Sequence, residues 1–145
     1  MKINILLSLL LSLFLCSCTV APVPIDYGKD ACHFCKMNIV DNQHAAEIVS
    51  KKGKAFKYDA LECMLNDMKG QNESDLELIL TTTYDAPGVF LDVHLGTYLI
   101  SENMPSPMGA NLNAFMDKKL AESAKDQNGG VLLNWEELNS ELLNK

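Results

Sequence analysis

The chain has 145 residues, with 12 Lys or Arg against 19 Asp or Glu, and therefore a formal net charge of −7. This length suffices for one domain with a real core but not comfortably for two. The negative charge opposes binding to nucleic-acid phosphates, and no run of basic residues suggests it. After the N-terminus, no apolar span is long enough to cross a membrane.

Residues 1–17 have the features of a lipoprotein signal peptide. A basic residue, Lys2, precedes an almost wholly apolar run over residues 3–15, and the sequence Leu-Cys-Ser-Cys that ends at Cys18 resembles a bacterial lipoprotein box. Cys18 fits the acylated position because Ser17, before it, is small. We therefore predict a mature chain that begins at Cys18 and is anchored to a membrane by acyl chains. An ordinary secretory signal or a membrane-spanning anchor is the alternative.

The predicted location is the cell envelope. Thr19 follows the acylated cysteine, where an Asp would indicate retention in the inner membrane of a typical Gram-negative cell. The prediction is therefore the outer membrane, with the protein facing the periplasm. Residues 18–29 are predicted to form an extended, flexible tether because prolines are spaced through them. The domain itself is predicted to cover residues 30–145.

Soft metal ligands gather at residues 32–37, whose sequence is CHFCKM. Thiolates and thioethers select Cu(I) over harder cations. Cys35 and Met37 are two residues apart, so in an extended segment both side chains point to one face. Cys32 precedes them on a turn and can join them or form a disulfide with Cys35. With Cys63, the predicted domain has an odd number of cysteines, which leaves a thiol for function in an exported protein.

A hairpin and a helix are predicted next. The first strand, the turn, the second strand and the helix cover residues 45–50, 51–54, 55–58 and 60–69. Gly53 can take a positive φ in the turn. Asp59 is the predicted cap of the helix and Gly70 its end.

The apolar residues of this helix recur at the helical period, at Leu61, Met64, Leu65 and Met68. We predict that they face the core, so neither Met64 nor Met68 is a candidate ligand. Cys63 lies on the opposite side of the helix, where it is either partly exposed or turned toward another part of the site.

The second half alternates strands with helices. Strands are predicted at residues 76–84, 89–95, 97–101 and around 112–114, a short apolar segment at 131–134, and helices at 117–127 and 135–143. Residues 103–109 form a loop shaped by Pro and Gly, in which Met108 lies between Pro107 and Gly109. A Met in such a loop is a candidate ligand, although Met also fills irregular gaps well. The order of elements predicts a small single α+β domain of two strand–strand–helix units with an extra C-terminal helix.

Several groups of spaced residues resemble the pattern of the NosL family, from about residue 30 to residue 143. They are Cys32-x-x-Cys35-x-Met37, Phe56-x-x-Asp59-x-x-x-Cys63-Met64, Gly96-Thr97-Tyr98 with Ser101, Pro107-Met108-Gly109-Ala110 with Phe115, and Gly129-Gly130 with Trp135-x-x-Leu138. The Cys-x-Met pair and the Pro-Met-Gly loop are the specific parts of this resemblance.

The resemblance implies a copper-binding lipoprotein of the nitrous oxide reductase system. It implies binding of Cu(I) outside the cytoplasm and delivery to nitrous oxide reductase or its ABC-type maturation complex, so the chain is predicted to be a metallochaperone rather than an enzyme. The predicted metal residues are Cys35, Met37, Met108 and Cys32, with His33 and His44 as further candidates. The family often has Gly before the Met of Cys-x-Met. Lys36 stands there in this chain, so we expect a less tightly bent loop and a lowered thiol pKa.

Two other classes of function remain open. The C-x-x-C pair has the spacing of a thiol–disulfide oxidoreductase, with the intervening His stabilising a thiolate. It does not, however, open a helix after a strand, as a thioredoxin-like fold requires. Cys32, Cys35 and Cys63 with one His would instead form a structural zinc site. That site would leave Met37 and Met108 without a role.

Overall fold

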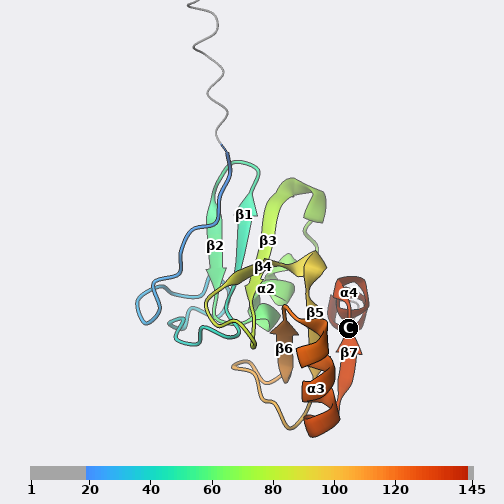
Figure 1. Cartoon of the computed structure of the whole chain (residues 1–145). Coiled ribbons are helices and arrows are strands. Elements are labelled where there is room, and N and C mark those ends of the chain that lie inside the picture. Colours follow the sequence, from blue (N-terminus) through green and yellow to red (C-terminus); the bar gives the residue numbers. More distant parts are fainter. Residues whose placement is uncertain (1–18, 144–145) are drawn as a thin grey trace, which may run out of the picture.

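The computed structural model describes residues 19–143. The predicted signal peptide and the predicted acylation site, Cys18, lie outside these described residues. Within them, the chain forms two antiparallel sheets and three α-helices (Figure 1). No described helix is both long and apolar enough to cross a bilayer.

The first sheet has four strands in the order β2-β1-β3-β4. Their bounds are Ala46–Ser50 for β1, Ala55–Tyr58 for β2, Leu76–Thr82 for β3 and Phe90–Asp92 for β4. β1 and β2 form the predicted hairpin, in which Gly53 has a φ of 77° and donates its N–H to the Ser50 carbonyl at 2.8 Å. Glycine takes this left-handed conformation at little cost because it lacks a Cβ, so the turn closes tightly.

Helix α2 (Leu61–Met68) follows the hairpin and packs against β1, β2 and the C-terminal helix α4 (Trp135–Leu143). Met64 and Met68 are buried, which confirms their prediction as core residues. The prediction that Asp59 caps this helix is wrong. The helix begins later than predicted, so Ala60 occupies the N-cap position and makes no side-chain capping bond.

The second sheet has three strands in the order β6-β5-β7. Its strands and helix are β5 (Thr97–Ile100), β6 (Leu112–Phe115), α3 (Lys118–Asn128) and β7 (Val131–Leu133). Asp117 caps α3 by accepting the N–H of Lys119 at 2.7 Å. The predicted α+β fold is therefore confirmed. The two predicted strand–strand–helix units are β1-β2-α2 and β5-β6-α3, and α4 is the predicted extra helix. Strands β3 and β4 complete the first sheet, and β7 completes the second.

Two predicted strands are shorter than expected by two residues or more. β3 ends at Thr82, and the predicted strand over 89–95 ends in a 3₁₀ turn, Val93–Leu95. The Asp92 carboxylate accepts the N–H of His94 at 2.9 Å and caps this turn. A short polar side chain offers the backbone this alternative to a strand, which apolar alternation alone does not reveal. A similar turn, Glu73–Asp75, precedes β3.

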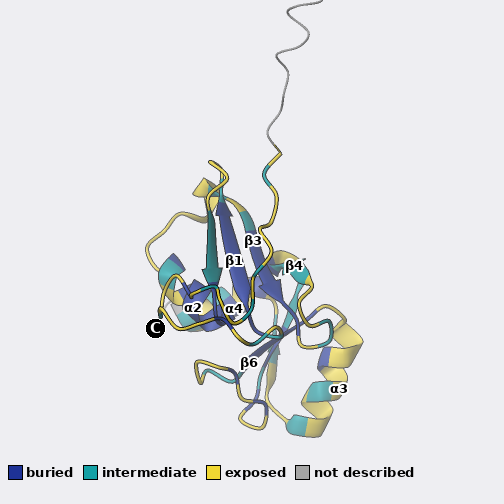
Figure 2. Ribbon diagram, turned by 90° about the vertical axis from the view of Figure 1, so that its left-hand side faces the viewer, coloured by how far each residue is buried: buried dark blue, intermediate teal, exposed yellow. Residues whose placement is uncertain are grey.

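Strand β1 is buried along almost its whole length (Figure 2). One of its faces packs on α2, and the N-terminal segment covers the other. Val23 N–H donates to Glu47 Oε1 at 2.8 Å, and Lys57 Nζ donates to the Pro24 carbonyl at 2.7 Å. The segment predicted as a tether over 18–29 therefore contacts the first sheet in its described part.

Candidate metal centre

Three cysteine thiols meet beside the first turn of α2. Cys32 and Cys35 come from the loop of residues 32–37, and Cys63 comes from the helix. Their sulfur atoms all lie within 4.8 Å of one another, and none of the three is in a disulfide. Cys32 and Cys63 are buried, whereas Cys35 is partly exposed. Two inner sulfurs and one outer sulfur thus form a cluster that is reached from one side.

Backbone hydrogen bonds shape the loop that carries two of these thiols. Cys32 N–H donates to the Met37 carbonyl at 2.8 Å, and Lys36 N–H donates to the Cys32 carbonyl at 3.1 Å. His33 N–H donates to the carbonyl of Lys57 at 2.7 Å and joins the loop to β2. The loop is thereby held at the end of the hairpin that leads into α2, next to Cys63.

Lys36 bends this loop in the way that a glycine would. Its φ is 67°, in the left-handed region where a Cβ costs roughly 1–2 kcal/mol. The Lys36 ammonium contacts the His33 carbonyl oxygen and fastens the side chain across the turn. The expectation of a less tightly bent loop is therefore wrong, because these contacts hold the strained backbone without glycine.

Cys63 is absent from the predicted copper ligands, although it belongs to the zinc alternative. Residues 61–65 are all buried, because α2 packs against the first sheet and α4, and Cys63 also meets the two thiols of the loop. The helix is therefore buried on more than one face. Of the two predicted positions of Cys63, partial exposure is wrong and a position that faces the site is confirmed. Two signals point to it in the sequence: the odd third thiol and the family-like pattern from Phe56 to Cys63.

Backbone N–H groups make Cys32 the most acidic of the three thiols. Burial raises the pKa of Cys32, but N–H groups that donate to its sulfur, including those of Asp59 and Cys35, leave the pKa below its ordinary value. Burial raises the pKa of Cys35, although the Met37 N–H opposes it. Burial and the neighbouring Cys32 raise the pKa of Cys63 far above its ordinary value. Cys32 therefore ionises first, and a bound cation displaces the protons of the other two.

The two predicted thioether ligands are exposed, in contrast to the inner thiols. Met37 follows Cys35 on the same loop and is 50% exposed, and Met108 is 38% exposed. The Met37 backbone N–H donates to the Cys35 sulfur, and this hydrogen bond holds the two residues close together. Coordination of a metal by either methionine stays a prediction.

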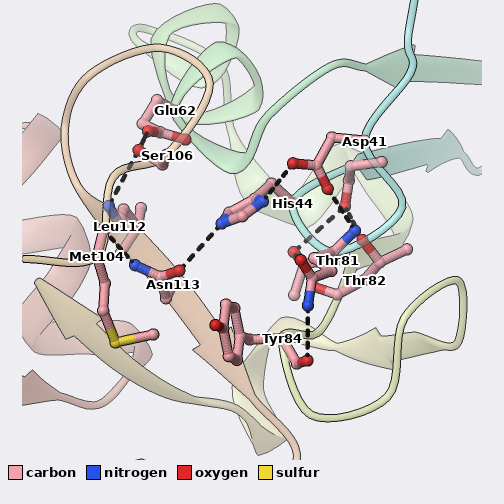
Figure 3. Close-up of polar contacts among 12 residues, drawn as sticks. Asp41, His44, Glu62, Thr81, Thr82, Tyr84, Met104, Ser106, Leu112 and Asn113 are labelled. Carbon is pink, nitrogen blue, oxygen red and sulfur yellow. Dashed lines mark hydrogen bonds and ion pairs between the residues drawn. The ribbon is translucent and has the colours of Figure 1, made fainter. Parts of the chain in front are cut away.

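The loop of residues 103–109 is tied to the helix that carries Cys63 (Figure 3). The Ser106 hydroxyl donates to the Glu62 carboxylate and accepts the N–H of Leu112 at 3.1 Å. Glu62 directly precedes Cys63 in α2. This bond therefore positions the Pro-Met-Gly loop relative to the part of the helix that holds the third thiol.

Neither candidate histidine belongs to the thiol cluster. Both ring nitrogens of the buried His44 have other partners, the Asp41 carboxylate at 2.9 Å and the Asn113 side-chain oxygen at 3.0 Å (Figure 3). His33 is exposed, and its ring packs edge-on against Phe56 with the ring centroids 4.8 Å apart. Within residues 19–143, the three cysteines of the alternative zinc site therefore lie together, but neither candidate histidine lies with them.

Three sulfurs at this separation suit a soft metal ion. Metal–sulfur bonds of about 2.3 Å place neighbouring sulfurs about 3.8 Å apart, so small side-chain adjustments bring the thiols into one coordination shell. Cys32 and Cys35 lie on a turn rather than at a helix N-terminus, where the helix dipole activates the thiol of many disulfide oxidoreductases. The geometry therefore favours metal binding over thiol–disulfide exchange.

One family matches this sequence and this fold. The family model described as NosL matches residues 22–143. Among solved structures, the chain is similar to the crystal structure of the copper chaperone NosL from Shewanella denitrificans, with a TM-score of 0.69 and 19% identity over 82% of this chain and 96% of that chain. No curated protein matches. Because the family model covers most of its length, the chain belongs to the NosL family.

Proposed function

We propose that this protein is a copper chaperone that binds Cu(I) at Cys32, Cys35 and Cys63 and releases it to a partner. The observation that carries the proposal is the convergence of three thiols from two separate segments of a NosL-family chain. A similar protein of known structure is a copper chaperone, which supports the same role here. Such a role rests on binding and release rather than on catalysis.

The composition of the cluster favours Cu(I) over harder cations. Thiolates are soft ligands, and we infer that the exposed Met37 and Met108 add neutral thioethers. A structural zinc ion is best held by four enclosed ligands. The described thiol cluster offers three, because His44 is engaged elsewhere.

The difference between inner and outer sulfurs supports transfer of the metal. Cys35 and Met37 are accessible, whereas Cys32 and Cys63 are buried. An incoming ligand from a partner can therefore replace the outer sulfurs while the inner thiols still hold Cu(I). The raised pKa values of Cys35 and Cys63 assist release, because protons compete with the metal for these sulfurs.

The proposed destination of the copper is nitrous oxide reductase or its ABC-type maturation complex, as the family resemblance implies. Acylation of Cys18 would hold the protein at a membrane of the cell envelope. Thr19 after that cysteine supports the outer membrane, with the domain facing the periplasm. The metal site would then be exposed to partners in the same compartment.

Competition titration of the protein against a Cu(I) chelator tests the proposed site. Cys35→Ser and Cys63→Ser should each weaken Cu(I) binding by about tenfold or more, which corresponds to about 1.4 kcal/mol, because each removes a charged sulfur ligand. X-ray absorption should lose one sulfur neighbour in each variant. Unchanged affinity in both variants would contradict the copper site, and a preference for Zn²⁺ over Cu(I) would favour the structural zinc site.

The same titration separates ligand methionines from packing methionines. Met37→Leu and Met108→Leu keep size and apolarity, so folding should change little while Cu(I) affinity falls by a smaller factor than in the cysteine variants. Met116→Leu is the matched control, because Met116 is 42% exposed and lies outside both loops. A methionine whose replacement behaves like the control is not a ligand.

A further inference from the structure

The N-terminal strap, residues 19–25, fixes the domain at a short distance from the chain that precedes it. Val23 and Pro24 bind Glu47 and Lys57, which lie opposite each other on β1 and β2. An extended chain spans at most about 3.4 Å per residue, so the link from Cys18 to Val23 is no longer than about 17 Å. The docked strap therefore limits how far the domain can move away from residue 18.

The strap leaves the sheet at the end where β1 and β2 join. In both views the described chain starts at the same end of the molecule as the β1–β2 turn, and α3 lies toward the other end (Figures 1 and 2). The thiol cluster is also remote from the turn. Its loop binds Lys57 at the far end of β2, and the path from Lys54 to Tyr58 is about 13 Å along the strand.

Positive charge is concentrated in this turn. Lys51, Lys52 and Lys54 are exposed and flank Gly53, in a chain whose net charge is −7. Lys54 Nζ lies 4.6 Å from the centre of the Phe56 ring, on the β2 side of the hairpin. The exposed acidic residues that border this end, Asp75 and Glu77, lie on the side of β3, because Ser50 pairs with Leu76. The lysines thus lie on the side of the sheet formed by β1 and β2, which the strap also contacts, rather than on the side of β3.

We propose that the strap presents this lysine turn to an anionic phospholipid surface and directs the thiol cluster away from the membrane. The proposal rests on the acylation of Cys18, which is part of the proposed function. Lysines near a surface of anionic headgroups are attracted to it, and the attraction weakens within a Debye length and with added salt. The described chain begins at the same end of the domain as the turn, so the lysines belong to the part of the domain that is nearest to residue 18 (Figures 1 and 2). A partner would therefore meet the copper site from the side that faces away from the bilayer.

Lysine footprinting of the acylated protein in nanodiscs tests this orientation. A water-soluble acetylating reagent labels exposed lysines, and mass spectrometry compares Lys51, Lys52 and Lys54 with the exposed Lys118 and Lys119 of α3. The turn lysines should be acetylated severalfold more slowly in nanodiscs that contain phosphatidylglycerol than in nanodiscs of phosphatidylcholine alone. High salt should remove this difference, and the α3 lysines should react equally in both.

A lengthened chain is the matched control, because it keeps the fold and every lysine. An insertion of about 20 Gly and Ser residues after Thr19 adds a random coil of about 25 Å and frees the domain to turn. Acetylation of the turn lysines should then rise to the level of the α3 lysines. Equal protection in the native and lengthened chains would overturn the orienting role of the strap, and equal protection in the two lipids would overturn the headgroup contact. The intact mass of the protein shows separately whether Cys18 is acylated. A missing acyl group would contradict both the proposed lipid anchor and this inference.

Discussion

Lys36 holds a backbone conformation that glycine adopts more easily, next to two of the three thiols. Its φ of 67° is unfavourable for a residue with a Cβ, and the contact of its ammonium with the His33 carbonyl offsets part of that cost. Residues in such conformations cluster at functional sites, where the surrounding structure holds them. The loop geometry thus depends on a residue that the family pattern often replaces with glycine.

Lys36→Gly should stabilise the fold by about 0.5–1 kcal/mol. Glycine relieves the Cβ strain, while the lost ammonium contact and the greater freedom of the unfolded chain cancel part of the gain. Chemical denaturation measures the free energy of unfolding. Lys36→Ala is the control, because it removes the same side chain but keeps the Cβ, and it should be no more stable than the parent. An equal gain in both variants would assign the effect to the side chain instead of to φ.

At the scale of elements, local patterns predict bounds better than they predict buried faces. The hairpin, α2, α3 and α4 follow from apolar spacing and flanking glycines, which act within a few residues, although the predicted capping residue of α2 is wrong. Cys63 is buried beside Cys32 and Cys35, so the loop of residues 32–37 is a partner of α2 in addition to the first sheet. No pattern inside α2 signals this second partner. The contact between Glu62 and Ser106 is equally invisible in the sequence, because it joins a helix to a distant loop.

Ser106→Ala should destabilise the fold by about 1–3 kcal/mol, because it removes the partner of buried polar groups. Glu62 Oε1 loses its hydroxyl donor and Leu112 N–H loses its acceptor, while Glu62 Oε2 already has no hydrogen-bond partner among the described residues. Denaturation in urea measures the loss. Ser123→Ala, at an exposed position of α3, is the matched control and should change stability by less than about 0.5 kcal/mol. A Ser106 variant as stable as this control would show that the loop is not held by the contact.

At the scale of the whole molecule, a buried carboxylate holds the N-terminal strap on the first sheet. Glu47 is fully buried on β1 and accepts the Val23 N–H, while its Oε2 has no hydrogen-bond partner among the described residues. An acidic residue within a strand is ordinarily read as a solvent-facing position. Here the strap covers that face. The prolines of the strap indicate an extended chain but not the surface on which it packs, so the sequence alone predicts a flexible tether.

The burial of Glu47 makes the stability of the whole fold depend on pH. Burial, the largest cause, raises the pKa of Glu47 above the ordinary value of 4.5, while the Val23 N–H and Lys57 oppose the rise. A carboxyl group with a raised pKa in the folded chain binds its proton more tightly there. It therefore stabilises the fold below the ordinary value, and this contribution is lost as pH rises through the folded pKa.

Glu47→Gln should therefore raise the free energy of unfolding at neutral pH. The amide is uncharged at every pH and still offers Val23 an acceptor oxygen, so the variant avoids the cost of a buried charge. The gain should shrink as pH falls and vanish below the ordinary carboxyl pKa, where Glu47 is protonated in both the folded and the unfolded chain. Urea denaturation from about pH 4 to about pH 8 measures this dependence. Glu77→Gln, at an exposed position of β3, removes the same charge without burial and should show no comparable gain. A gain that persists at low pH, or that appears equally in the Glu77 variant, would show that net charge rather than the buried carboxylate is responsible.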